Sequence, residues 1–183
     1  MQSGQTDHAK SAFVLYSEEE RRRRDESPWT LVQGILAPVQ FIVFLISLAL
    51  ILRYLWNGQG LWAAEWSVVV KTLTLYAIMI TGSIWEKKVF GCYLFARPFF
   101  WEDVFSMLVL ALHTAYLLAL YAGSLTSQSL MLVALAAYAA YIVNAAQFLW
   151  KLRMARLDHA ARQSNPVSPS PASHQSTLAG GAA

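Results

Sequence analysis

The feature that most constrains the fold is a run of 18 residues without a charge, ILAPVQFIVFLISLALIL. A helix needs about 20 mostly apolar residues to cross a bilayer, and three further long apolar stretches follow this one. The chain is 56% hydrophobic and 14% charged, whereas about a quarter of the residues in a soluble domain are charged. The sequence therefore predicts an all-α integral membrane four-helix bundle, with one membrane domain over 28–157 and helices at about 29–54, 66–85, 102–122 and 130–153.

Both ends of the chain are polar. Residues 1–27 are predicted to form a polar tail. Within it, the charged run from Glu18 to Glu26 is compatible with a short surface helix, but its small apolar surface favours fraying, because little burial offsets the entropy of ordering. Residues 158–183 are rich in Pro, Ser and Ala and are predicted to be a disordered tail.

Basic residues mark alternate ends of the predicted helices. They precede the first helix, lie between the second and third, and follow the fourth; the other side offers only Arg53. Membrane proteins keep such residues in their cytoplasmic loops, so both termini and the central connector are predicted to be cytoplasmic. The residues in question are Arg21 to Arg24, Lys87, Lys88, Arg97, Lys151, Arg153, Arg156 and Arg162.

The central connector is aromatic as well as charged. It runs from Thr81 to Ser106 as TGSIWEKKVFGCYLFARPFFWEDVFS, and Gly91 and Pro98 favour a re-entrant or surface-lying loop. Trp and Tyr are common at membrane interfaces, but that preference does not call for so many Phe residues. The composition suits a site for a large, flat, partly polar molecule. Its aromatic residues are Trp85, Phe90, Tyr93, Phe95, Phe99, Phe100, Trp101 and Phe105.

Polar residues within the spans follow helical spacing. Glu102, Ser106 and His113 share one face of the third helix, and His113 lies about 16 Å below Glu102, near mid-membrane. Such a histidine is a neutral hydrogen-bonding group, an axial ligand to a pigment metal or a proton relay. Stripes on the first helix (Gln33, Gln40, Ser47 and Tyr54) and the fourth (Tyr141, Asn144, Gln147 and Lys151) are expected to face other helices. Lys71 is expected to snorkel to the nearby interface.

Glu86, Glu102 and Asp103 are the candidate acid–base residues. A partly buried carboxyl pair can hold one member protonated as an acid and the other ionised as a base. The alternative is a solvated salt-bridge cluster with Lys87, Lys88 and Arg97 at the membrane face. One cysteine, Cys92, excludes an intrachain disulfide and any multi-cysteine metal site, and the sequence has no phosphate-binding loop or hydrolase motif.

Four long segments carry a resemblance to a known family: WTLVQGILAPVQFIVFLISLALILRYL, VVVKTLTLYAIMITGSIWEKKVFGCYLFA, FFWEDVFSMLVLALHTAYL and ALAAYAAYIVNAAQFLWKLR. Together they closely resemble the 3-vinyl bacteriochlorophyllide hydratase family of phototrophic bacteria, over about 29–157. The resemblance implies a lyase of bacteriochlorophyll a synthesis that hydrates the 3-vinyl group of chlorophyllide a, or its bacteriochlorophyllide counterpart, to a 3-(1-hydroxyethyl) group. It implies a bacterial cytoplasmic or intracytoplasmic membrane, a magnesium chlorin substrate, and other pathway enzymes rather than nucleic acid as partners.

Hydration is not a redox reaction, so no separate cofactor and no protein-bound metal are expected. We expect Glu102 to act as the acid and Glu86 or Asp103 as the base. Adjacent residues diverge by about 100° on a helix, which favours Glu86 as the partner of Glu102. The expected pigment-binding residues are Lys87, Lys88 and Arg97 for the propionate, Trp85 and Trp101 for the ring, Ser106 and Asn144 within the bundle, and His113 for the magnesium if the ring enters the bundle.

Two other functions use the same residues. A non-catalytic pigment-binding or assembly factor of the photosynthetic apparatus needs the same aromatic and basic side chains. A small structural or transport membrane protein would use His113 and Asn144 only to pack the bundle. The absorption spectrum separates the first from a hydratase, because loss of the vinyl conjugation shifts pigment absorption to the blue.

Overall fold

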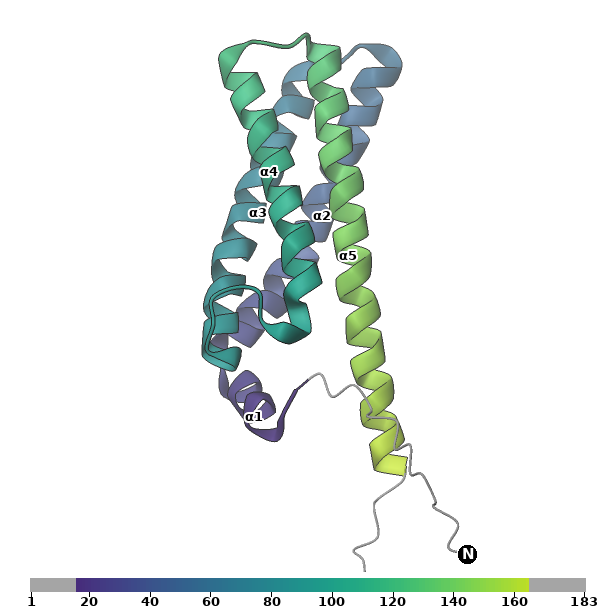
Figure 1. Cartoon of the computed structure of the whole chain (residues 1–183). Helices are drawn as coiled ribbons and strands as arrows, with labels where there is room; N and C mark the ends of the chain where they lie inside the picture. The colour runs from purple at the N-terminus through teal and green to yellow at the C-terminus, as the bar shows by residue number, and fades with distance from the viewer. Residues whose placement is uncertain (1–15, 165–183) are drawn as a thin grey trace, which may run out of the picture.

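The computed structural model describes residues 16–164, and all the regular secondary structure among these residues is helical (Figure 1). In chain order the elements are α1 (Glu18–Glu26), α2 (Pro28–Asn57), α3 (Leu61–Phe90), the short 3₁₀ helix η1 (Arg97–Phe99), α4 (Phe100–Ala122) and α5 (Ser127–Ser164). Four of these helices are long and apolar enough to cross a membrane: Pro28–Asn57, Leu61–Phe90, the stretch Arg97–Ala122, and Ser127–Lys151. The predicted all-α architecture with four long apolar helices is confirmed.

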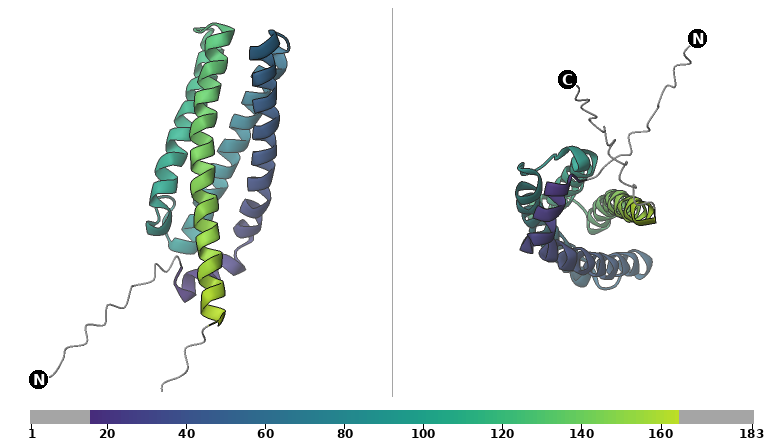
Figure 2. Two further views of the ribbon diagram at one scale, coloured as in Figure 1. Left: turned by 90° about the vertical axis from the view of Figure 1, so that its right-hand side faces the viewer. Right: turned by 90° about the horizontal axis from the view of Figure 1, so that it is seen from below.

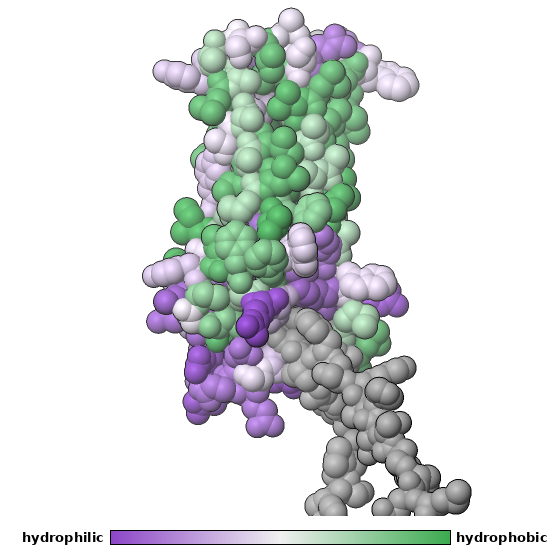
Figure 3. Space-filling model, in the orientation of Figure 1, coloured by the Kyte–Doolittle hydropathy of each residue, from purple (hydrophilic) through white to green (hydrophobic). Residues whose placement is uncertain are grey.

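The four long helices run up and down in sequence. The α2–α3 and α4–α5 turns lie at one end, here called the turn end, while α1 and the α3–α4 connector lie at the other, the connector end (Figure 1). The principal contacts pair α2 with α3 and α4 with α5, and α5 projects past the other helices at the connector end (Figure 2). An apolar belt covers the middle of the helices, and hydrophilic residues gather at the connector end (Figure 3).

Two helices extend beyond their predicted limits, because no glycine or proline ends them earlier. Helix α3 begins at Leu61 rather than 66 and ends at Phe90 rather than 85. It is bounded by Gly60 and Gly91, at φ 84° and 85°, a conformation that glycine adopts without strain. The predicted re-entrant or surface loop therefore reduces to residues 91–99, because the stretch before Gly91 is helical.

Helix α5 also exceeds its predicted limit. It continues to Ser164 rather than ending near 153, so residues 158–164, assigned to the disordered tail, are helical. Between Lys151 and Ser164 the sequence has neither Gly nor Pro, and the first proline is Pro166, so nothing local ends the helix earlier. The rest of that predicted tail, 165–183, and residues 1–15 of the N-terminal tail lie outside the described residues.

Helix α1 is formed rather than frayed. Ser17 and Glu20 make a reciprocal capping box, with a bond of 2.7 Å from the Ser17 N–H to the Glu20 carboxylate. Tyr16 is buried in front of the helix and stacks on Phe90, with ring centroids 5.7 Å apart. The cap and this aromatic anchor supply the stabilisation that the charged run lacks by itself.

Polar stripes face the bundle interior, as predicted. Gln40 and Ser47 are buried, and the Tyr138 hydroxyl of α5 donates to the Ser47 Oγ at 2.6 Å. The Gln33 amide donates to the Thr81 hydroxyl of α3 at 2.7 Å. The expectation for Lys71 is wrong. Because α3 begins at Leu61, Lys71 lies about 15 Å along it, and its side chain points inward with no exposed surface.

Candidate active site

The connector end brings four ionisable side chains together beneath the α3–α4 connector. Glu86 comes from the end of α3, Glu102 and Asp103 from the first turn of α4, and Lys151 from α5. The three carboxyl residues are only 5%, 6% and 4% exposed, respectively. They meet because a connector of nine residues, 91–99, joins two antiparallel helices. The predicted set of three carboxyl groups is therefore assembled in the structure.

Glu86 and Asp103 are buried neighbouring carboxyl groups, held by two consecutive connector residues. Burial and a second carboxyl group nearby both disfavour ionising the two together, so such a pair can retain a proton. Two connector amides also point at the pair: the Phe95 N–H donates to Asp103 at 2.6 Å, and the Ala96 N–H donates to Glu86 at 3.3 Å. The pair is thus enclosed by backbone as well as by helices.

Glu102 has a different partner. Its carboxylate is 2.6 Å from the Lys151 ammonium, which also donates to the Pro98 carbonyl and lies 4.8 Å from the centroid of the Phe99 ring. The helical-wheel argument that paired Glu102 with Glu86 is wrong, since Asp103 is the residue that turns toward α3. The predicted surface salt-bridge cluster is wrong as well. Lys87, Lys88 and Arg97 are exposed and make no salt bridge with these carboxyl groups in the described part of the chain.

Lys151 is the site residue that sequence reasoning missed. It stood on the predicted polar stripe of the fourth helix, seven residues after Asn144. Two helical turns separate the two positions, so they share a face, and that face contacts the carboxyl-bearing turn of α4. The signal that could have found it is the presence of a lysine at the end of this stripe, at the same end of the bundle as Glu102.

Backbone strain marks the connector above the carboxyl pair. Phe95 has φ 61° and is the one non-glycine residue with positive φ in the described chain. A bulky residue rarely adopts this conformation, and such strain concentrates where surrounding contacts impose it. Here the contact that imposes the conformation is the hydrogen bond from the Phe95 N–H to the Asp103 carboxylate.

Apart from Phe105, which is half-buried on α4, the predicted aromatic residues divide into two groups. The inner aromatic cluster fills the space between α1, η1 and the helix ends with Tyr16, Trp85, Phe90, Phe99 and Phe148. The outer aromatic surface consists of residues that are 43% to 66% exposed, namely Tyr93, Phe95, Phe100 and Trp101. The Lys87 ammonium lies 5.1 Å from the Tyr93 ring centroid, so charge and aromatic surface adjoin at the connector. Trp85 belongs to the inner group and Trp101 to the outer one.

Polar contacts continue from the carboxyl groups into the bundle. The Asn144 amide of α5 donates to the Ser106 Oγ of α4 at 2.9 Å, and both residues are buried. Deeper still, His113 Nδ1 is 2.8 Å from the Val109 carbonyl. A carbonyl only accepts, so Nδ1 carries the hydrogen, and in the neutral ring Nε2 presents a lone pair.

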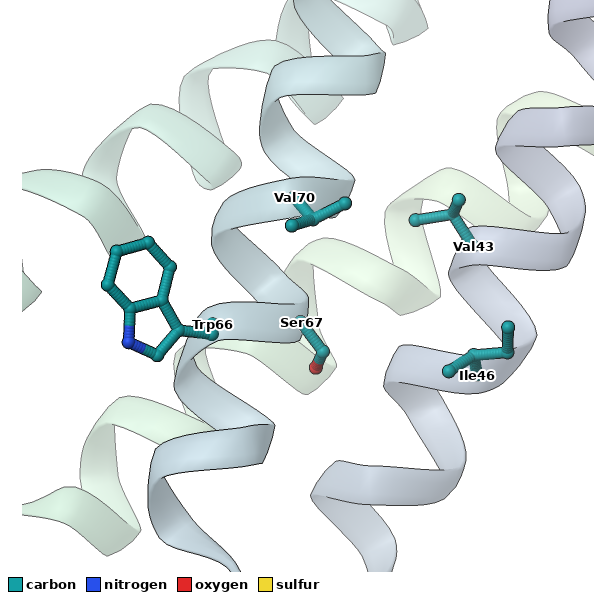
Figure 4. Close-up of a pocket in the computed structure, with 5 residues that line it drawn as sticks. All are labelled: Val43, Ile46, Trp66, Ser67 and Val70. Carbon is teal, nitrogen blue, oxygen red and sulfur yellow. The ribbon is translucent and has the colours of Figure 1, made fainter.

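The structure also has an open apolar groove of about 260 Å³ between α2 and α3, lined by Val43, Ile46, Trp66, Ser67 and Val70 (Figure 4). Its one hydroxyl group, on Ser67, already bonds to the Ala64 carbonyl at 2.7 Å and to Ser47 at 2.6 Å, and the Trp66 indole N–H can only donate a hydrogen bond. The groove therefore offers no free group for acid–base chemistry. It belongs to the apolar belt rather than to the carboxyl site.

Four helices long and apolar enough to cross a membrane, with buried carboxyl groups and an ion pair at one end, define a helical bundle with a site suited to proton transfer. A model of the 2-vinyl bacteriochlorophyllide hydratase family matches residues 16–154, and the chain belongs to this family. The family resemblance seen in the sequence is thereby confirmed.

Two relatives carry the same name. The 2-vinyl bacteriochlorophyllide hydratase of Rhodobacter capsulatus is 61% identical over 157 residues, which cover 86% of this chain and 91% of the relative. The protein of that name from Cereibacter sphaeroides is 64% identical over 149 residues, covering 81% of this chain and 92% of the relative. No solved structure matches the chain.

Proposed function

We propose that this protein is a hydro-lyase that adds water to the ring vinyl group of chlorophyllide a or a bacteriochlorophyllide, and so forms the 1-hydroxyethyl pigment of bacteriochlorophyll synthesis. Membership of the hydratase family supports the reaction. The observation that carries the mechanism is the buried Glu86–Asp103 carboxyl pair beside the Glu102–Lys151 ion pair. One pair contains a proton to give, and the other contains a carboxylate that can accept one.

The chemistry needs both functions. A proton from the Glu86–Asp103 pair adds to the terminal vinyl carbon, and positive charge develops on the carbon next to the ring. Water then forms a C–O bond at that carbon while Glu102 accepts its proton, so the C=C π bond is replaced by one C–H and one C–O bond. Proton exchange between the neighbouring residues Glu102 and Asp103 restores the starting state. This assignment exchanges the acid and base roles expected from the sequence.

The pigment ring is proposed to bind against the outer aromatic surface. Trp101 is 66% exposed and packs edge-on against Phe100, with centroids 5.6 Å apart, which leaves a flat apolar area beside the carboxyl site. Lys87, Lys88 and Arg97 lie exposed on the same connector and would hold the propionate.

The residues of the bundle take supporting roles. Trp85 supports the connector from the inner aromatic cluster, and Ser106 with Asn144 braces the turn of α4 below Glu102. His113 has no exposed surface, so reaching it would require the ring to separate α4 from α5. We therefore do not assign it to the pigment magnesium.

We further propose that the helices span the bacterial cytoplasmic membrane with the connector end in the cytoplasm. The basic residues before α2, between α3 and α4, and after the apolar part of α5 support this orientation. The apolar belt (Figure 3) would then lie in lipid, and the connector end would receive the pigment from other enzymes of the pathway.

The test is a set of carboxyl-to-amide substitutions in membranes supplied with the vinyl pigment. Glu86→Gln and Asp103→Asn should each lower turnover by about 10²-fold or more, which is the usual contribution of a general acid. Glu26→Gln makes the same change on an exposed carboxylate of α1 and should have no effect. Hydroxyethyl product is measured by the blue shift in absorption and by chromatography.

Two outcomes would overturn the proposal. Near-normal turnover in both variants would remove the pair from the mechanism. Pigment binding by the unsubstituted protein without any product would instead indicate the non-catalytic pigment-binding factor.

A further inference from the structure

A second set of polar residues lies in the bundle interior, away from the carboxyl site. It consists of Lys71 on α3 with His113 and Tyr116 on α4, and none of the three residues has any exposed surface. Within the described residues, the Lys71 Nζ, the His113 Nε2 and the Tyr116 hydroxyl have no hydrogen-bond partner. The proposed reaction uses none of these atoms.

The three residues belong to one cluster. The Lys71 ammonium lies 3.8 Å from the centroid of the Tyr141 ring of α5. The His113 ring stacks on Tyr138 with centroids 5.7 Å apart, and Tyr116, three residues after His113, lies on the same face of α4. The unpartnered polar residues of α3 and α4 therefore lie beside the Tyr138 and Tyr141 rings of α5.

The three unpartnered side chains have complementary capacities to donate and accept hydrogen bonds. Lys71 can only donate, the lone pair of His113 Nε2 can only accept, and the Tyr116 hydroxyl can do both. A buried polar group without a partner is costly, and an ionisable residue at this depth usually meets a charged partner or lines a hydrated cavity. Lys71 makes no salt bridge within the described residues. Buried water typically makes about three hydrogen bonds with groups of this kind.

We infer that Lys71, His113 and Tyr116 form an internal water-binding site. Asn144 Oδ1 and Gln147 Oε1 of α5 are also buried without a partner in the described chain, and they offer further polar atoms toward the carboxyl groups. These two side chains stand between the level of Tyr141 and that of Lys151 along the same helix.

This arrangement gives the water site a role that rests on the proposed function. A pigment ring bound against the outer aromatic surface would cover the connector, and the carboxyl site would lose its direct access to bulk water. Internal water held by Lys71 can then reach the reacting carbon from the bundle side. Lys71 is thus a positioning residue for the water that the reaction consumes.

X-ray hydroxyl-radical footprinting of the full chain in lipid nanodiscs tests the water site without reference to activity. Radicals formed from bound water oxidise the side chains that hold it, even when these are buried. Tyr116 and His113 should be oxidised faster than Met131, which is also fully buried and is intrinsically more reactive. Labelling of Tyr116 and His113 no faster than that of Met131 would show that the region is dry and would overturn the inference.

Two variants sharpen the test. Lys71→Met keeps the apolar stem and should reduce Tyr116 labelling several-fold, whereas unchanged labelling would remove Lys71 from the site. Thr72→Val is the matched control. Thr72 is equally buried on α3, but its hydroxyl already donates to the Val68 carbonyl at 2.8 Å, so labelling should not change.

Kinetics test the supply role separately. Lys71→Met should lower kcat by about tenfold and leave the KM for pigment unchanged, while Thr72→Val should alter neither. An unchanged kcat in Lys71→Met would overturn the supply role. Absence of hydration by the unsubstituted protein would instead contradict the proposed function, and the footprinting result would still decide whether the water site exists.

Discussion

The ion pair between Glu102 and Lys151 gives the sharpest test of the geometry at the connector end. The two side chains are 8% and 19% exposed, with 2.6 Å between the paired atoms. Removing one partner of a buried pair costs about 3–5 kcal/mol, because an uncompensated charge remains. Since Lys151 keeps some contact with solvent, Lys151→Met should fall at the lower end, at about 3 kcal/mol. Glu102→Gln should cost less, about 1–2 kcal/mol, because the Pro98 carbonyl and the new amide oxygen still accept from Lys151.

The double variant Glu102→Gln/Lys151→Met decides whether the two residues act as a pair. With both charges removed, it should be more stable than the sum of the single effects predicts, by about 1–2 kcal/mol. The measurement is equilibrium unfolding in mixed micelles followed by tryptophan fluorescence, with Glu26→Gln as the surface control. Additive effects within about 0.5 kcal/mol would refute the pairing, and with it the reason for assigning Glu102 as the base.

Two further predictions concern the connector and α1. Phe95→Gly should be more stable than Phe95→Ala by about 0.5–1 kcal/mol, because only glycine relieves the positive φ; equal denaturation midpoints would contradict the strain. Burial raises the pKa of the Tyr16 phenol above its ordinary value of 10.0, so the folded state holds this proton more tightly than the unfolded chain. Docking of α1 should therefore be complete below pH 10 and weaken above it, as reported by the mobility of a spin label on α1, and Tyr16→Phe should remove this dependence.

The sequence was sufficient to predict the helical architecture because the physical signal is local. An uncharged run long enough to span a membrane is helical wherever it occurs, since lipid leaves the backbone no other partners. The stripe containing Gln40 and Ser47 likewise depends only on helical spacing. The helix limits were harder to predict. A start at Leu61 rather than 66 changed Lys71 from an interfacial residue into an interior one.

Partner choice in the site could not be predicted from one helix at a time. A helical wheel states that Glu102 and Asp103 point about 100° apart, but it does not state which neighbour each one meets. In the bundle, α4 lies between α3 and α5, so Asp103 turns to Glu86 and Glu102 turns to Lys151. Because Glu102 and Asp103 point in different directions from α4, each one is buried against a different neighbouring helix and has its own partner.

The proposed membrane position accounts for the carboxyl site at one end of the bundle, because charge is costly in hydrocarbon. An ionised carboxylate in mid-membrane is expensive, whereas at the helix ends the connector amides, Lys151 and nearby water can all compensate it. The first turn of α4 also favours negative charge through the helix dipole. The proposed acid role also requires that the Glu86–Asp103 pair be shielded from bulk water, and both residues are buried beneath the connector. A site at the edge of the apolar belt satisfies both requirements, because the connector end is polar enough to hold charge and enclosed enough to hold a proton.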